Sequence, residues 1–156
     1  MDKMIVTALL IIAGVVSAIS VFNALYPLIG QSNDTMRGMQ ARIDDRFKTQ
    51  IQIIHAAKTP SDEVDVWVKN VGAARVSAIE STDVFFGPQG NFARLPYNTG
   101  SGTYWQYSVE GGGAAWDPSG TVKIVIKGYS FLGAGTRYFV KVVLSNGVNS
   151  EYYFSE

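Results

Sequence analysis

Few side chains in this sequence are of types that do chemistry. His55 is the only histidine, and the chain has no cysteine, which rules out disulfides, thiolate metal sites and thiol nucleophiles. No catalytic triad or metal cluster can be built around a lone histidine, so His55 is interpreted as structural. The sequence therefore predicts no catalytic residue, no metal ligand and no cofactor, and it predicts that the protein is not an enzyme.

Three further groups of residues have chemical alternatives. Asp44 and Asp45 could bind a cation, but adjacent carboxylates on a helix diverge and usually face solvent. The glycines at 111–113 lack the Lys-Ser/Thr pair that follows a phosphate-binding loop. Three tryptophans could form a sugar-binding surface, although packing in a core is the commoner use of such side chains: Trp67, Trp105 and Trp116.

The element on which the sequence is organised is an uncharged apolar stretch, residues 4–29. It exceeds the ~20 residues that a helix needs to cross a bilayer. A cleaved signal with a small-residue site at 16–18 is disfavoured, because the apolar pattern continues past Ala18. We expect a helix buried in a bilayer or inside a polymer. The residues expected to contact neighbouring helices are Ile5, Leu9, Ile12, Gly14, Val16, Ala18, Val21 and Leu25.

Two short features qualify this helix. Gly14 and Ala18 are four residues apart on one face, a spacing that allows close helix–helix approach, although small residues are common in any apolar helix. Pro27 removes a backbone hydrogen bond, and Gly30 lies three residues later. We interpret the pair as a kink between the apolar half and the more polar segment after it; bending and local melting both remain open.

The segment after Gly30 is amphipathic. Its apolar residues recur every three or four positions, the helical pattern: Met36, Met39, Ile43, Phe47, Ile51 and Ile54. This stripe predicts one helix, or two coaxial ones, over residues 1–57, with the stripe lying against the following domain. The first domain is therefore placed at residues 1–58, divided into the apolar segment 4–29 and an amphipathic extension 30–58.

From residue 59 the pattern is that of a β domain extending to residue 156. Alternating apolar and polar residues separated by Gly, Pro and Asn-Gly turns indicate strands. The predicted strands are 64–69, 75–80, 83–86, 92–96, 103–109, 121–127, 137–144 and 150–155. The predicted fold class is α+β: a long N-terminal hydrophobic α-helix followed by an immunoglobulin-like antiparallel β-sandwich. The zero net charge argues against a nucleic-acid partner.

Four stretches carry a family resemblance: MIVTALLIIAGVVSAISVFNALYP, RIDDRFKTQIQIIHA, DVWVKNVGAARVSAIESTDVFFGPQGNFARLPY and VVLSNGVNSEYYFS. The resemblance that they carry covers nearly the whole chain. The chain resembles the archaeal flagellin (archaellin) superfamily, which is type IV pilin-like, and is closest in character to the archaellum G- and F-type proteins. These stretches are family patterns and not catalytic motifs.

The resemblance implies a structural subunit of an archaellum filament, for motility or adhesion, that waits in the cytoplasmic membrane and then polymerises through its apolar helix. The expected partners are other copies of the chain, the membrane before assembly, the archaellum assembly machinery and its motor ATPase complex. The alternative is a membrane-anchored accessory or stator-like protein whose sandwich binds the surface layer. A third class, an anchored enzyme or sugar-binding domain, has little support.

Two departures and one modification site accompany the resemblance. Position 5 is Ile5, where many bacterial pilins have a docking glutamate, and no prepilin-peptidase signal precedes the apolar run. Processing of the N-terminus is therefore left open. Asn33 begins the sequon Asn33-Asp34-Thr35. Because archaellins are often glycosylated, Asn33 is a candidate glycosylation site; a capping or solvated asparagine is the alternative.

Overall fold

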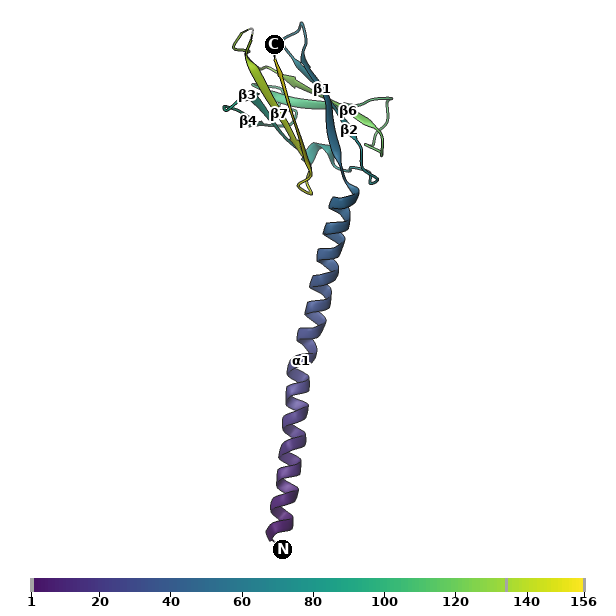
Figure 1. Ribbon diagram of the computed structural model, residues 1–156, viewed down its shortest axis with the longest axis vertical. Helices are drawn as coiled ribbons and strands as arrows, with labels where there is room; N and C mark the ends of the chain where they lie inside the picture. The colour runs from purple at the N-terminus through teal and green to yellow at the C-terminus, as the bar shows by residue number, and fades with distance from the viewer. Residues whose placement is uncertain (1, 134, 156) are drawn as a thin grey trace. The chain divides into compact units, whose positions relative to one another are not determined.

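The computed structural model describes residues 2–133 and 135–155, with the side chains of residues 28–35 outside that description (Figure 1). The chain divides into two compact units, Met1–Arg42 and Ile43–Glu156. One α-helix, α1 (Asp2–Lys48), includes Pro27 within its span. Among the described residues, eight strands come after it. The fold is thus the predicted long apolar helix followed by a β-sandwich.

The C-terminal end of α1 is fixed by contacts with a distant loop. Thr49 donates hydrogen bonds to the Asp45 carbonyl from its amide (2.9 Å) and from its hydroxyl (2.7 Å). The amides of Ala73 and Ala74 donate to the Lys48 carbonyl at 2.8 and 3.0 Å. These donors occupy carbonyls that have no partner at a helix end, so the helix ends at Lys48.

Residues 51–58 correct the sequence prediction. They form strand β1 (Ile51–Lys58), and the prediction of a helix through residue 57 is wrong there. Ile51 and Ile53 point inward, a bulge between Ile53 and His55 places Ile54 outward, and Ala56 points inward again. The bulge lets apolar residues at helical spacing alternate correctly in a strand.

The sandwich consists of two four-stranded antiparallel sheets, in the orders β1-β2-β6-β5 and β4-β3-β7-β8 (Figure 1). The remaining strands are β2 (Val64–Asn70), β3 (Asp83–Pro88), β4 (Ala93–Leu95), β5 (Tyr104–Val109), β6 (Thr121–Lys127), β7 (Arg137–Val143) and β8 (Asn149–Ser155). All seven were expected to within two residues at either end. The predicted strand at 75–80 is wrong: Val76 makes a single bridge to Trp116, and Ile79–Ser81 is a 3-10 turn, η1.

The core lies between the two sheets. Alternate residues of β2 and β6 face alternate residues of β3 and β7. The fully buried side chains include Val64, Val66, Val68, Val84, Phe86, Trp105, Trp116, Val122, Ile124, Ile126, Tyr138 and Val140. Trp105 and Trp116 are therefore core residues, as expected, whereas Trp67 is half-buried on an outer face.

Both open edges of the sandwich are partly closed. At one edge the Ile53 amide of β1 donates to the Ser150 hydroxyl of β8 at 3.0 Å. At the other, the Trp105 amide of β5 donates to the Pro96 carbonyl just after β4, also at 3.0 Å. These links use backbone groups that would otherwise lie unpaired at a sheet edge.

The predicted contact of the amphipathic stripe with the domain is wrong for the helical stripe residues that belong to the sandwich's own unit. Ile43 and Phe47, which belong to the same unit as the sandwich, are 48% and 85% exposed. Among the stripe residues of this unit Ile51 alone is buried, and it lies in β1. Helical spacing in the sequence therefore did not produce a helix packed on the core.

Candidate functional site

The apolar part of α1 carries most of the exposed large hydrophobic side chains among the described residues. Asp2–Pro27 is long and apolar enough to cross a membrane: 26 residues with a mean hydropathy of 2.7, none of it buried within the structure. Burying one large apolar side chain is worth about 1.5–3 kcal/mol. A helix with this many exposed apolar side chains requires lipid or other helices around it.

Two hydroxyl side chains within this segment donate hydrogen bonds to the helix backbone. The Thr7 hydroxyl donates to the Lys3 carbonyl and the Ser20 hydroxyl donates to the Val16 carbonyl, each at 2.8 Å. Side-chain bonds to the preceding turn allow Ser and Thr to lie in an apolar medium at low cost. Both hydroxyls are therefore compatible with burial in a bilayer.

The residues predicted to contact other helices all lie on α1 and are all exposed: Ile5, Leu9, Ile12, Gly14, Val16, Ala18, Val21 and Leu25. A Cβ added to Gly14 would meet nothing within 4 Å, so its face is open to a neighbour. Pro27 and Gly30 both lie within the continuous helix α1. The side chain of Asn33 lies outside the described residues, and no observation measures a bend between Pro27 and Gly30, so the glycosylation site and the kink stay predictions.

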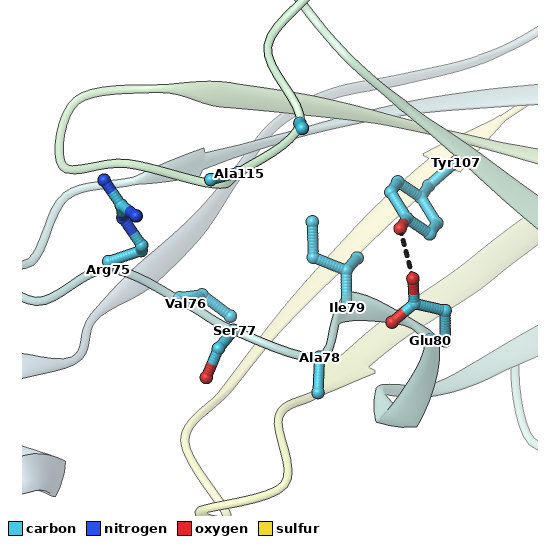
Figure 2. Close-up of a pocket in the computed structure, with 9 residues that line it drawn as sticks. Arg75, Val76, Ser77, Ala78, Ile79, Glu80, Tyr107 and Ala115 are labelled. Atoms are coloured by element: carbon cyan, nitrogen blue, oxygen red, sulfur yellow. Dashed lines mark hydrogen bonds between the residues drawn. The ribbon is translucent and has the colours of Figure 1, made fainter.

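A shallow pocket of about 250 Å³ lies beside η1 (Figure 2). The Tyr107 hydroxyl at its wall donates to the Glu80 carboxylate at 2.6 Å. That hydrogen bond lowers the pKa of Glu80 and raises the pKa of Tyr107 to about 12. Ser77 also lines the pocket, but no described hydrogen bond joins its hydroxyl to a base that could activate it as a nucleophile. The Tyr107–Glu80 hydrogen bond instead connects η1 to β5.

The Tyr107–Glu80 bond predicts a pH effect on stability. Between pH 10 and 12 an unfolded tyrosine loses its proton while folded Tyr107 keeps it, so the free energy of unfolding falls across this window. We expect Tyr107→Phe to lessen that fall, and Glu80→Gln to lessen it similarly, because either change removes the charged bond. Urea midpoints at pH 9 and 11.5 measure the effect. An unchanged fall in both variants would contradict the assignment.

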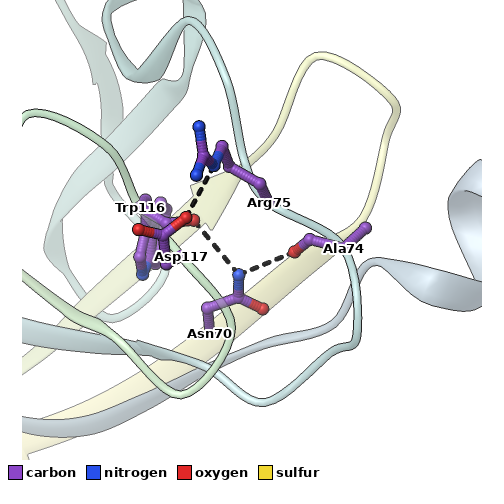
Figure 3. Close-up of polar contacts among 5 residues, drawn as sticks. All are labelled: Asn70, Ala74, Arg75, Trp116 and Asp117. Carbon is purple, nitrogen blue, oxygen red and sulfur yellow. Dashed lines mark hydrogen bonds and ion pairs between the residues drawn. The ribbon is translucent and has the colours of Figure 1, made fainter.

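A second polar cluster is structural (Figure 3). Asn70 is fully buried at the end of β2, and its Nδ2 donates to the carbonyls of Ala74 (2.9 Å) and Trp116 (3.3 Å). Its Oδ1 accepts from the Gly72 amide at 3.0 Å. Arg75 and Asp117 close the cluster with a 2.6 Å ion pair. Every polar atom of the amide is thus used to hold two loops together, which leaves none for a ligand.

The outer faces of the two sheets differ in chemistry. On the β1-β2-β6-β5 sheet the outward residues are mainly polar, and Lys123 pairs with Asp65 at 2.7 Å. On this face the ring of the exposed His55 lies against Trp67 at a tilt of 34°, with ring centroids 5.4 Å apart. Among the described residues, no group of three His, Cys, Asp or Glu side chains could hold a metal ion.

The β4-β3-β7-β8 sheet instead carries aromatic side chains on its outer face. Phe92 lies 4.6 Å from Phe139, Phe139 lies 5.0 Å from Tyr153, and Phe85 lies 6.5 Å from Phe92, between ring centroids. We call these four residues the aromatic row. The sequence analysis missed it. Aromatic residues at the polar positions of β3, β7 and β8 were the signal that could have revealed it.

Comparison with known proteins identifies the family. No protein-family model and no curated protein matches the chain. Among solved structures, it is similar to the archaellum periplasmic stator protein FlaG from Sulfolobus acidocaldarius, with 34% identity and a TM-score of 0.62. The match covers 68% of this chain and 99% of that one. The chain belongs to the archaellum FlaG family.

Two further solved structures resemble the chain. A chain of the archaellum periplasmic stator protein complex of FlaF and FlaG from Sulfolobus acidocaldarius is matched at 35% identity and a TM-score of 0.60, over 68% of this chain and 89% of that one. Flagellin FlaB1 of Methanocaldococcus jannaschii is matched at 11% identity and a TM-score of 0.55, over 69% and 89%. The flagellin likeness shows a shared fold alone. The predicted archaellum relationship is confirmed.

Proposed function

We propose that this FlaG-family chain is a membrane-anchored accessory protein of the archaellum with a stator-like role. The observation that carries the proposal is the difference in identity: 34% to FlaG over 99% of its length, against 11% to a flagellin. This favours the alternative stated in the sequence analysis over the filament subunit that stood first there.

In this proposal the two units of the chain have separate tasks. The apolar span Asp2–Pro27 lies in the cytoplasmic membrane, and the sandwich stands outside it, below the surface layer. The described part of the chain offers no nucleotide-binding loop, so energy would come from the motor ATPase complex among its partners. The sandwich would bind a stationary component of the envelope, such as the surface layer, or another archaellum protein.

Shearing and fractionation test this location. Filaments are sheared from native cells, and the sheared material and the envelope are analysed by mass spectrometry, which also reads the N-terminus. We expect this chain in the envelope fraction while a different protein dominates the filaments. Its recovery as the dominant sheared species would overturn the accessory role and establish the filament subunit.

The filament subunit remains the second candidate, since the apolar side chains of α1 are unburied and the sandwich shares the flagellin fold. Under that hypothesis a charge at Gly14 would lie among packed helices, where an unpaired carboxylate is strongly disfavoured. Gly14→Glu is then expected to abolish assembly and leave the sandwich folded, whereas Gly14→Ala would preserve it. Normal filaments containing Gly14→Glu as the main subunit would exclude packing through this face.

A further inference from the structure

The aromatic row breaks the alternation that the rest of the sandwich obeys. A sheet with one solvated face normally places polar residues outward, as the β1-β2-β6-β5 sheet does. In the β4-β3-β7-β8 sheet both faces are apolar at one end, since Phe86 and Tyr138 point inward while Phe85 and Phe139 point outward. A sheet that is apolar on both faces is expected to be covered on both.

Two features bring the aromatic row together: the register of the paired strands, and the close approach of the Phe92 backbone to Gly87. Phe139 is paired with Tyr153 on β8 and with Gly87 on β3. A Cβ at Gly87 would lie 2.7 Å from the Phe92 Cα, because the turn after β3 folds back over the glycine. Phe92 therefore fills the place that a β3 side chain would take, and the row continues across three strands.

Exposure within the row is uneven: Phe139 at its centre is only 5% exposed, whereas the flanking rings reach solvent. Phe92 is 48% and Tyr153 is 41% exposed, and Arg137 lies over the Tyr153 ring at 4.9 Å from its centroid. The face is hollowed by a depression of about 540 Å³, with Phe85 and Phe139 among its lining residues. Exposed aromatics beside an arginine are the composition of protein–protein binding hot spots.

The charges around the depression indicate which kind of partner fits. Asp83 pairs with Arg94 at 2.6 Å, and Lys141 pairs with Glu151 at 3.8 Å. A lipid surface or a nucleic acid would require a clear excess of Lys and Arg. A rim with both signs matches a protein surface that also carries both signs.

The shape of the face argues against a second copy of this chain as the occupant. A two-fold contact centred on this face would place one depression against the same depression of the other copy. The facing hollows would leave a void, and the side chains lining it would lose their packing contacts. A convex surface fills the hollow instead.

We propose that the outer face of the β4-β3-β7-β8 sheet, centred on the aromatic row, is the docking surface for a convex apolar projection of a second, different archaellum protein. The inference rests on the proposed function in its choice of partner. It agrees with the existence of a stator complex of FlaF and FlaG, one chain of which is 35% identical to this chain.

Binding of the purified FlaF protein of the same cells to the full chain in lipid nanodiscs tests the proposal. We expect Phe92→Ser and Tyr153→Ser each to raise the Kd about 30-fold, the size of a hot-spot loss. The control is Ile54→Ser. Ile54 is 48% exposed, like Phe92, but it lies on β1 of the other sheet. The Kd of this variant is expected to equal that of the unchanged chain. Unfolding midpoints of all variants show that each remains folded.

Three results would overturn the docking surface. The first is equal binding by the row variants and the control. The second is no binding by the unchanged chain. The third is self-association of the unchanged chain that the row substitutions abolish, since the occupant would then be a second copy. The location of the chain in sheared filaments or envelope is measured independently, so failure of the proposed function is distinguishable from failure of this surface.

Discussion

A chain shortened to residues 43–156 is expected to leave the membrane completely and to remain a folded sandwich. The deleted part contains the entire apolar span Asp2–Pro27, and Ile43–Glu156 is a compact unit with its own core. The FlaG structure, 99% of which matches 68% of this chain, shows that a chain of about this length folds. Membrane flotation and circular dichroism measure the two expectations.

A matched replacement separates an anchor from a specific assembly helix. Residues 4–26 are exchanged for a Leu-Ala repeat of the same length, which spans a bilayer by length and apolarity alone. As an anchor this helix should restore both membrane binding and motility to cells that lack the protein. Membrane binding without motility would instead show that the side chains of α1 make specific contacts with other helices.

Phe86→Ala is expected to lower the free energy of unfolding of the sandwich by about 3–5 kcal/mol. Phe86 is 1% exposed and lies at the centre of an aromatic cluster, with ring centroids 4.8 Å from Tyr129, 5.7 Å from Tyr138 and 6.3 Å from Phe154. Its truncation leaves a cavity that the two sheets cannot close. Because domains are typically stable by only about 5–15 kcal/mol, urea denaturation should show a large shift of the midpoint.

The control for this prediction is Ile54→Ala. Ile54 also lies on a strand but points outward from the β1 bulge, so its truncation is expected to cost less than about 1 kcal/mol. Equal losses in the two variants would mean that the inward and outward assignments of the strands are wrong.

Local patterns in the sequence were sufficient for most of the fold. The uncharged run at 4–29 predicted the apolar helix, because a helix alone satisfies its own backbone in an apolar medium. Strict alternation predicted β6, and the Asn146-Gly147 pair predicted the turn before β8, where the Gly147 amide donates to the Leu144 carbonyl at 2.8 Å. Each of these depends on neighbours within a few residues.

The extent of α1 could not be predicted from its own residues. Ile51 and Ile54 continue the spacing of Ile43 and Phe47, so the pattern extended the helix by about two turns. The loop at 73–74 supplies the donors that end α1, and β2 supplies the partner for β1. Both are separated from Lys48 along the chain, and a local periodicity contains no information about them.

The sequence by itself determined that the protein has an apolar helix requiring burial, a β domain after it, and no cysteine or histidine cluster for chemistry. The tertiary structure alone decided where the aromatic side chains go. Phe85, Phe92, Phe139 and Tyr153 are separated by up to 68 positions in the sequence, and strand register brings them together. Because a shift of one residue in register would send each strand's side chains to the opposite face, such a surface exists only after the strands have paired.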